Sequence, residues 1–375
     1  MLNRAPPIVP MGAAKVVWSV AQALAKDGWE VHFLTPKSFE PLPEVEGVHF
    51  HEVPVPDHED KASALFFLTG LPHFRRLLAT VRPQLVYDNC SPIPFVPGYP
   101  FCWNRVITRI HHVYGASVLR HKTGLINPLA TLVGEQWFRL LDGRRVIASS
   151  ASTQRILSGI VRHPEGIRVI NPGIELSSLP VYSADSPRDP TLAAVVSRLA
   201  PNKGLNVLLQ AWRLLEDRDP DLRLVIGGTG RSERDLKALA RDLKLRRVEF
   251  LGYVSDDQKW DLLRRCVVYP FPTYIEGWGI GILEAMAMGA PVVTTRVPGV
   301  VDVVQHGSTG LLVEPGDPRS LAEAIHELFS DDELRSRLAR SARVAIQRYD
   351  LGQVTREEIE YLELHASQQV IAPAV

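Results

Sequence analysis

The sequence predicts an α/β fold with two doubly wound domains that face one another across a cleft. Two observations support this prediction. Short runs rich in valine and isoleucine alternate with longer amphipathic stretches, and this pattern restarts after a polar, proline-rich stretch near the middle of the chain. Strands of about five residues that alternate with helices of about 10–15 residues are typical of parallel βαβ units. With 375 residues, the chain is long enough for two such domains.

The predicted strands are short and apolar, as in a parallel sheet that is buried on both faces. In the first half of the chain they are Val31–Thr35, Val48–Val53, Leu85–Asn89, Val106–His111, Val146–Ser150 and Ile167–Asn171. In the second half they are Leu192–Leu199, Leu222–Gly228, Val248–Gly252, Val267–Phe271, Pro291–Thr295 and Gly310–Val313. The amphipathic stretches between them predict helices, among them Ala13–Lys26, Gly204–Glu216, Glu233–Leu243, Asp257–Arg265 and Ser320–Phe329.

A polar stretch, Leu179–Pro190, separates the two sets of strands and is typical of an interdomain linker. We therefore predict an N-terminal domain over residues 1–178 and a C-terminal domain over residues 179–349. Because ligands bind at the carboxyl ends of parallel strands, the two sheets would share one ligand-binding cleft.

The N-terminal domain leaves little room for a complete first strand. Only Met1–Asn3 precede a proline-rich turn, which contains Gly12 and leads into the first predicted helix. Either this domain lacks most of a central strand or the natural start lies upstream of Met1, and we favour the upstream start.

Composition and charge argue against several classes of protein. Hydrophobic residues make up 45% of the chain and charged residues 22%, which is ordinary for a soluble globular protein. No apolar run reaches the roughly 18–20 residues of a membrane span, and the N-terminus lacks the apolar core of a signal peptide. Three scattered cysteines favour reduced thiols in a cytoplasmic protein. Zero net charge and the lack of a recognised module argue against nucleic-acid binding.

The middle of the N-terminal half is basic. Residues 61–168 contain 14 Lys and Arg against 4 Asp and Glu, and they include the apolar stretches Ala64–Leu68 and Trp137–Leu141. This combination predicts a peripheral contact with an anionic membrane surface at its inner face, or with an anionic acceptor. The alternative is a basic rim over ordinary core residues.

The segment Phe271–Thr295 is the richest in residues that carry chemistry. The glycines of Gly277–Gly281 stand before and at the start of a predicted helix, where backbone N–H groups favour an anion such as phosphate. Glu276 and Glu284 flank this turn. Such a site suits a nucleotide sugar, because one carboxylate can accept the sugar hydroxyls and the other the ribose hydroxyls. The alternative is a kinked helix with a buried Glu284, which would need a hydroxyl or cationic partner.

Two cations follow another predicted strand. Arg198 and Lys203 lie at the carboxyl end of Leu192–Leu199, directly before the helix that begins at Gly204. Two positive charges at this place can neutralise a diphosphate and stabilise it as a leaving group. A solvated loop is the alternative.

Four motifs occur in a characteristic order along the second half of the chain. They are Ser197–Leu199 with Lys203-Gly204, then Phe250–Val254, then Glu276–Val293, then Gly307–Val313. In this order they resemble the motifs of retaining GT-B glycosyltransferases of family 4, the "glycosyl transferase group 1" type. The resemblance covers nearly the whole chain and is most specific from Val195 to Asp317. It implies a GT-B fold, with a Rossmann-like domain on each side of a central cleft and a C-terminal helix, within residues 350–375, that packs back onto the N-terminal domain.

The resemblance also implies which part of a nucleotide-sugar donor each motif meets. Arg198 and Lys203 bind the diphosphate, Glu276 binds the transferred sugar, and Glu284 binds the ribose. The backbone of Gly279, Ile280 and Gly281 binds the distal phosphate, and the backbone of Tyr253 and Val254 binds the base.

The match is less complete in the N-terminal domain. The family has a Gly-Gly loop after its first strand, whereas this chain has Gly12-Ala13. That departure puts one backbone contact with acceptor or phosphate in doubt. The family's histidine near the sugar corresponds to His111, with His112 as a competitor, and two surface histidines that close a strand are the alternative.

The resemblance therefore implies a retaining hexosyltransferase that uses a UDP- or GDP-sugar and needs neither a cofactor nor a metal. The acceptor would be a hydroxyl group on a lipid-linked or cell-envelope glycan, or alternatively on a soluble small molecule. In the expected mechanism, the leaving diphosphate takes the acceptor's proton, and Glu276 binds sugar hydroxyls rather than acting as a nucleophile. The rival hypotheses are a GT-B epimerase or phosphorylase, and a non-catalytic subunit that binds a nucleotide sugar.

Overall fold

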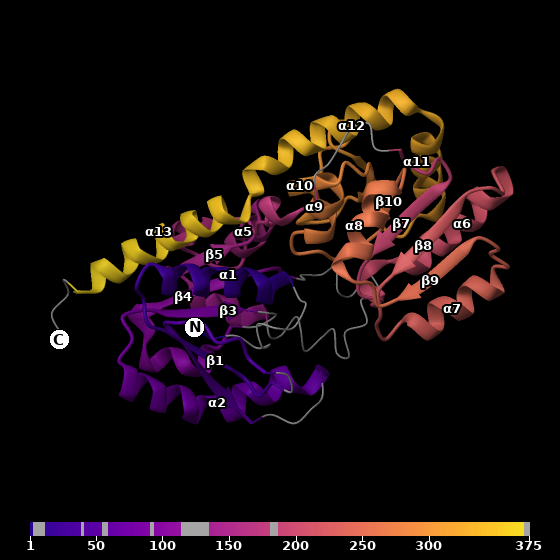
Figure 1. The fold of residues 1–375 in the computed structure, drawn as a ribbon. Helices are drawn as coiled ribbons and strands as arrows, with labels where there is room; N and C mark the ends of the chain where they lie inside the picture. Colours follow the sequence, from indigo (N-terminus) through magenta and orange to yellow (C-terminus); the bar gives the residue numbers. More distant parts are fainter. Residues whose placement is uncertain are drawn as a thin grey trace. The chain divides into compact units, whose positions relative to one another are not determined.

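The computed structural model describes residues 1–2, 12–38, 41–54, 59–90, 94–113, 135–180 and 187–370. These residues form two compact units, each with parallel strands at its centre (Figure 1). Within the described chain, unit 1 comprises residues 1–113, 135–173 and 351–370, and unit 2 comprises residues 174–350.

The division between the units comes earlier than the sequence pattern suggests, between Gly173 and Ile174 instead of after residue 178. The reason is that the side chain of Ile174 is buried in the core of unit 2 and its N–H donates to the carbonyl of Tyr349 (2.9 Å). Arg188, near the end of the expected linker, is also fixed to unit 2. Its guanidinium donates to the carbonyls of Cys266 (2.6 Å) and Gly289 (2.7 Å).

Unit 1 contains six parallel strands in two ladders, β2-β1 and β3-β4-β5-β6. Leu2 bridges both ladders, because it pairs with Leu34 on one side and with Asp88 on the other. The six strands are β1 (Val31–Pro36), β2 (Val48–Val53), β3 (Val86–Cys90), β4 (Val106–Ile110), β5 (Arg145–Ala148) and β6 (Ile167–Val169).

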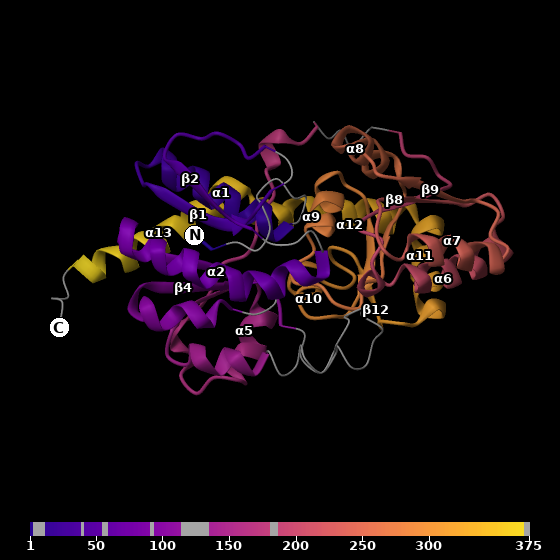
Figure 2. The same ribbon diagram turned by 90° about the horizontal axis from the view of Figure 1, so that it is seen from below.

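Helices cover both faces of these strands (Figures 1 and 2). Because side chains alternate along a strand, Phe33 and Ile107 pack with α1 and α13, whereas Leu34 and Ile110 share a core with Phe74 of α2. The helices are α1 (Gly12–Lys26), α2 (Glu59–Val81), α5 (Ala151–Ser158) and α13 (Leu351–Val370), with short 3₁₀ helices η1 (Val96–Phe101), η2 (Trp103–Arg105), η3 (Gln136–Leu141) and η4 (Pro164–Gly166).

Unit 2 repeats the same plan with six parallel strands in two ladders around one apolar core. The strands are β7 (Leu192–Val196), β8 (Arg223–Gly227), β9 (Val248–Gly252), β10 (Tyr269–Phe271), β11 (Val292–Thr295) and β12 (Leu311–Val313). The helices are α6 (Leu205–Arg218), α7 (Glu233–Asp242), α8 (Asp256–Arg265), α9 (Ile280–Ala287), α10 (Val300–Val303), α11 (Pro318–Ser330) and α12 (Asp332–Ala345), with η5 (Leu176–Ser178), η6 (Pro201–Lys203) and η7 (Ile346–Tyr349).

Every strand predicted from the sequence is present, although several end earlier than expected. The three cysteines, Cys90, Cys102 and Cys266, are free and buried. Among the described residues, no helix has both the length and the apolar character needed to cross a membrane.

The C-terminal helix α13 packs on unit 1, as the GT-B resemblance implies. A buried ion pair fixes it there. Glu358 of α13 lies 2.6 Å from the guanidinium of Arg109 on β4, and both side chains are fully buried. The hydroxyl of Tyr87 on β3 donates to the other oxygen of Glu358. Burial opposes the charge of Arg109, but Glu358 and Tyr87 outweigh burial and raise the pKa of this guanidinium above its ordinary value.

Glu358→Ala should therefore destabilise unit 1 by about 3–5 kcal/mol, because it leaves the charge of Arg109 buried without a counterion. Glu357→Ala is the matched control. The neighbouring Glu357 pairs with Arg168 on an exposed surface, and such pairs contribute only about 0–1 kcal/mol. Urea denaturation of both variants measures the difference. Equal losses in the two variants would contradict a structural role for the buried pair.

Candidate active site

The loops that follow β7 and β10 leave the sheet of unit 2 next to one another. β8 and β9 continue the sheet from β7, and β11 and β12 continue it from β10. Residues 193 and 268 form a parallel bridge, and the N–H of Ala194 donates to the carbonyl of Val268 (3.1 Å). The strand order therefore reverses between β7 and β10, and doubly wound sheets bind their ligands at the carboxyl ends of strands at such a point.

These two loops are bonded to each other. The carbonyl of Asn202 in η6 accepts the N–H of Tyr274 (2.8 Å) and the hydroxyl of Thr273 (3.0 Å). Gly204, which ends η6, has φ +67°, and a Cβ on it would lie 1.9 Å from the carbonyl oxygen of Pro272. A side chain at residue 204 would force the loops apart, so glycine is required for this close approach.

The contact between the loops brings Lys203 and Glu276 together. The Lys203 ammonium lies 2.6 Å from one carboxylate oxygen of Glu276, with only 13% and 16% of the two side chains exposed. It also lies 5.1 Å from the centre of the Phe271 ring. The N–H of Gly277 donates to the other Glu276 oxygen (3.3 Å). The structure thus joins two residues that the sequence pattern assigned to one site.

Helix α9 begins four residues after Glu276, at Ile280. Its N-cap is Gly279, with φ +91°, and no side chain caps the helix. The first helical bonds of α9 run from the N–H groups of Ile282 and Leu283 to the carbonyl of Gly279. The N–H groups of Ile280 and Gly281 come before these donors, so they remain available to a ligand. A helix N-terminus of this kind favours an anion.

Glu284, in the middle of α9, has a cationic partner that sequence analysis required but did not identify. The ammonium of Lys259, on α8, lies 2.9 Å from a Glu284 oxygen and 3.0 Å from Asp256. It also lies 4.0 Å from the centre of the Trp260 ring. Burial opposes the charge of Lys259, but the two carboxylates outweigh burial and raise its pKa. Lys259 is thus the cationic partner that a buried Glu284 needs.

Other predicted donor residues of unit 2 lie close in sequence to these pairs, but among the described residues they form no ion pair with them. Arg198 follows β7, is exposed, and takes part in none of the ion pairs in the described part of the chain. Tyr253, after β9, is 77% exposed. Val254 is half-buried and lies over the end of β8, where its methyl groups would be 3.2 Å from a Cβ on Gly227.

His111 belongs to unit 1, at the carboxyl end of β4, and is buried. Its Nε2 lies 2.5 Å from the amide oxygen of Asn89, and its Nδ1 lies 3.4 Å from the hydroxyl of Ser149. Burial, with help from Arg109, holds the pKa of His111 well below its usual value, so the ring is neutral at pH 7. The surface-histidine alternative is wrong for His111.

Gly12 is the first residue of α1. The turn predicted before it falls in residues 3–11, which lie outside the described chain. Among the described residues, no group of three or more His, Cys, Asp or Glu side chains is arranged to hold a metal ion.

Two family models match the chain. The model for glycosyl transferases group 1 matches residues 183–345, and the model for Glycosyltransferase Family 4 matches residues 10–178. Together they cover most of the chain. The protein is a family 4 glycosyltransferase. The resemblance carried by the Glu276 and Lys203 motifs is thereby confirmed.

Curated relatives of this glycosyltransferase extend over nearly its full length. It is 28% identical to D-inositol 3-phosphate glycosyltransferase of Corynebacterium glutamicum (strain R), over 87% of this chain and 85% of that protein. It is 27% identical to phosphatidyl-myo-inositol mannosyltransferase of Mycobacterium leprae (strain TN), over 96% of this chain and 94% of that protein.

Solved structures with the same fold include a sucrose-phosphate synthase from Thermosynechococcus elongatus. Its TM-score is 0.80 at 21% identity, over 98% of both chains. Anabaena HepE in complex with UDP and glucose has a TM-score of 0.72 at 21% identity, over 96% of this chain and 98% of that one. At these identities the likeness concerns the fold, and it confirms the predicted GT-B class.

We predict that Gly204→Ala will destabilise the glycosyltransferase more than Gly252→Ala does. The two glycines share a left-handed backbone, with φ +67° and φ +69°, so both variants suffer the same strain, of about 1–2 kcal/mol. A Cβ on Gly252 meets nothing within 4 Å, whereas one on Gly204 meets Pro272. Overpacking adds about 1–3 kcal/mol. Denaturant unfolding of both variants measures this excess, and equal losses would contradict the tight contact between the loops.

Proposed function

We propose that this glycosyltransferase moves a hexose from a UDP- or GDP-sugar to an acceptor hydroxyl with retention of configuration, without a metal or other cofactor. The observation that carries the proposal is the Lys203–Glu276 pair at the strand-order reversal, directly before the free N-terminus of α9. One cation, one carboxylate and a helix start are thereby set beside one another. This is what a diphosphate joined to a polyhydroxyl sugar requires.

The donor is proposed to lie along unit 2. Its diphosphate meets Lys203 and the exposed Arg198, and its distal phosphate meets the first turn of α9. The ribose hydroxyls meet Glu284, and the base meets the main chain of Tyr253 and Val254. HepE, which shares the fold, was solved with UDP and glucose, and this supports a nucleotide donor.

The charges around Lys203 suit a leaving group that carries negative charge. Before the donor binds, Glu276 neutralises Lys203. When a diphosphate binds, the lysine can turn to its oxygens and stabilise the charge that develops as the sugar leaves. Two protein cations would supply the positive charge that a bound metal ion supplies in metal-dependent enzymes. This is the physical basis for proposing metal independence.

Glu276 is proposed to bind sugar hydroxyls and not to attack the sugar. One of its oxygens accepts the Gly277 N–H, and the oxygen that Lys203 releases when the diphosphate binds becomes free to accept sugar hydroxyls. The acceptor hydroxyl would instead attack from the side of the departing diphosphate, which takes its proton. That path retains the configuration of the sugar. That His111 is a further ligand of the sugar remains a prediction.

A lipid-linked or cell-envelope glycan is the proposed acceptor, and the proposed location is the inner face of the membrane. Two relatives act, by their names, on inositol phosphate and phosphatidyl-myo-inositol. The basic segment 61–168 also exposes Phe101, Trp137 and Leu140, and the guanidinium of Arg75 lies 4.6 Å from the Phe101 ring centre. Exposed aromatic and basic side chains favour an anionic lipid surface. A soluble acceptor is the alternative.

Glu276→Gln should lower turnover about 10- to 100-fold, because a charged hydrogen bond in a site contributes about 1.5–3 kcal/mol. Release of nucleoside diphosphate from the donor measures the rate. Glu323→Gln, on the exposed face of α11, is the control and should be unchanged. Near-normal turnover of Glu276→Gln would remove Glu276 from the mechanism.

Lys259→Met should raise the KM for the donor about 10-fold and leave kcat within about twofold, because Lys259 orients Glu284 for binding and takes no part in the chemical step. Lys259→Arg should restore most of the affinity. Lys237→Met is the control, since Lys237 makes similar contacts with Glu233 and Phe250. An unchanged KM in Lys259→Met would contradict this positioning role.

A further inference from the structure

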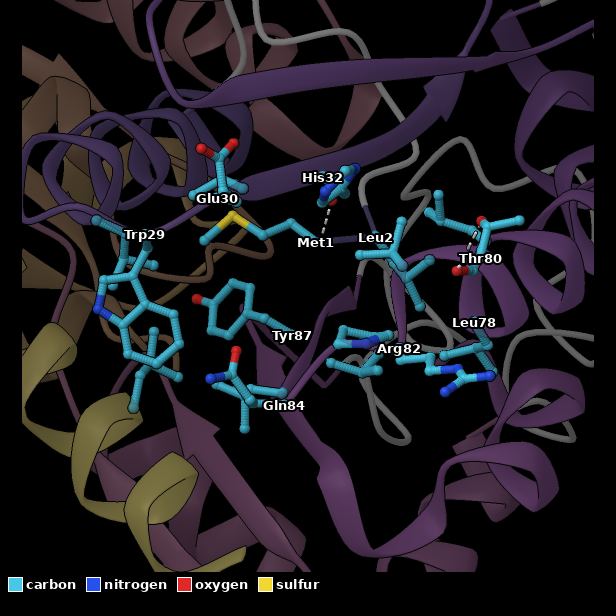
Figure 3. Close-up of a pocket in the computed structure, with 18 of the residues that line it drawn as sticks. Met1, Leu2, Trp29, Glu30, His32, Leu78, Thr80, Arg82, Gln84 and Tyr87 are labelled. Atoms are coloured by element: carbon cyan, nitrogen blue, oxygen red, sulfur yellow. Dashed lines mark hydrogen bonds between the residues drawn. The ribbon is translucent and has the colours of Figure 1, made fainter. Parts of the chain in front are cut away.

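A cavity of about 760 Å³ lies in unit 1, and its lining includes Met1, His32, Tyr87 and Arg82 (Figure 3). None of the described residues that line it belongs to unit 2. The candidate donor site is therefore positioned by other contacts. Among these are four hydrogen bonds around one arginine, Arg188.

The guanidinium of Arg188 joins the C-terminal ends of two helices, α8 and α9. Its Nη1 donates to the carbonyls of Leu263 (3.3 Å) and Cys266 (2.6 Å), at the end of α8. Its Nη2 donates to the carbonyls of Met288 (3.0 Å) and Gly289 (2.7 Å), at the end of α9. The last carbonyls of a helix have no partner within that helix. The planar fork of one arginine thus supplies donors to both helix ends at once.

The backbone beside Arg188 is fixed as well. The N–H of Asp189 donates to the carbonyl of Arg265 (2.9 Å), and the carbonyl of Asp189 accepts the N–H of Leu192 (3.1 Å), the first residue of β7. The Asp189 carboxylate lies 2.5 Å from the guanidinium of Arg223 on β8. Arg188 is therefore anchored to the sheet and reaches the two helices from a defined position.

The same two helices carry Lys259 and Glu284, whose ion pair lies one turn before the Arg188 bridge. Lys259 is four residues before Leu263 on α8, and Glu284 is four residues before Met288 at the end of α9. Residues four apart lie on the same face of a helix, about 6 Å apart along its axis. The helices are thus joined at two successive levels. Two contacts at different levels fix the angle between the helices as well as their distance, which one contact alone does not.

We propose that Arg188 is a positioning residue for the nucleotide-sugar donor. It holds α8 and α9 at the separation at which Lys259 meets Glu284, and this orients Glu284 toward the ribose. The inference rests on the proposed function of Glu284 as the ribose ligand. Because the hydrogen bonds of Arg188 go to the two helix ends, its loss should weaken donor binding and spare the chemical step.

Arg343 offers a matched control at the end of α9. Its guanidinium, on α12, donates to the carbonyl of Ala287 (2.9 Å), the last residue of α9. This bond joins α9 to α12 and not to α8. Arg343→Met should therefore cost stability, as Arg188→Met does, without loosening the Lys259–Glu284 pair.

The first test measures this pair in the full chain without a nucleotide. In Arg188→Met, acetylation of the Lys259 amine should become about threefold faster or more, because a loosened Glu284 raises the Lys259 pKa less and burial lowers it. Mass spectrometry of the Lys259 peptide measures the rate. Arg188→Gln keeps an amide donor but not the fork, so it should show the same direction of change with a smaller loss of stability. Arg343→Met should match the wild type, and an unchanged rate in both Arg188 variants would overturn the proposal.

The second test measures the donor. Release of nucleoside diphosphate at varied donor concentration should show the KM of Arg188→Met raised about 3- to 10-fold, with kcat within about twofold. Arg343→Met should leave the KM within about twofold. In a Lys259→Met background, Arg188→Met should raise the KM by less than about a further twofold, because both residues act through one contact. A full further rise in that background would mean a separate structural effect and would overturn the proposal.

The two tests separate this inference from the proposed function. A wild-type chain that binds neither UDP nor GDP would overturn the proposed function, and with it the role of Arg188 toward the donor, even if acetylation of Lys259 becomes faster in Arg188→Met. A wild-type chain that binds one nucleotide, with an equal KM in Arg188→Met, would overturn this inference alone.

Discussion

A carboxylate that is removed from water requires a cation, and three such pairs organise this glycosyltransferase. Lys203 meets Glu276 and Lys259 meets Glu284 in unit 2, while Arg109 meets Glu358 in unit 1. In each pair the partners come from different elements, so each pair also fixes one element against another. An unpaired charge in these places would be costly, and this cost makes each arrangement specific.

The first two pairs also define the proposed chemistry. They hold Glu276 before α9 and Glu284 in the middle of α9, each beside an ammonium group, ready for a ligand that carries both phosphates and hydroxyls. The close approach of the loops at Gly204 sets the position of Lys203, and the hydrogen bonds of Asn202 hold that approach. When a diphosphate binds, Lys203 would therefore exchange Glu276 for a phosphate oxygen, while the two loops keep their positions.

Much of the fold and part of the site could be predicted from the sequence because they depend on local pattern. The parallel strands follow from short apolar runs, and Glu276 and Glu284 follow from their place around a glycine-rich turn. Lys259 could not be identified, because its contact with Glu284 is made by side chains of two helices 25 residues apart. Arg109 and Glu358 were missed for the same reason. The boundary before Ile174 was not predicted, because the core that buries its side chain and the Tyr349 carbonyl that accepts its N–H belong to residues far along the chain.

The most direct test of the central claim is calorimetric titration of UDP and of GDP, in EDTA, into the full chain and its Glu284→Ala variant. The account predicts that one of the two nucleotides binds with one site per chain and that Glu284→Ala weakens it at least about 10-fold, which corresponds to the loss of one charged hydrogen bond. Failure of both nucleotides to bind, or equal affinity in the variant, would contradict a nucleotide-sugar site at α9.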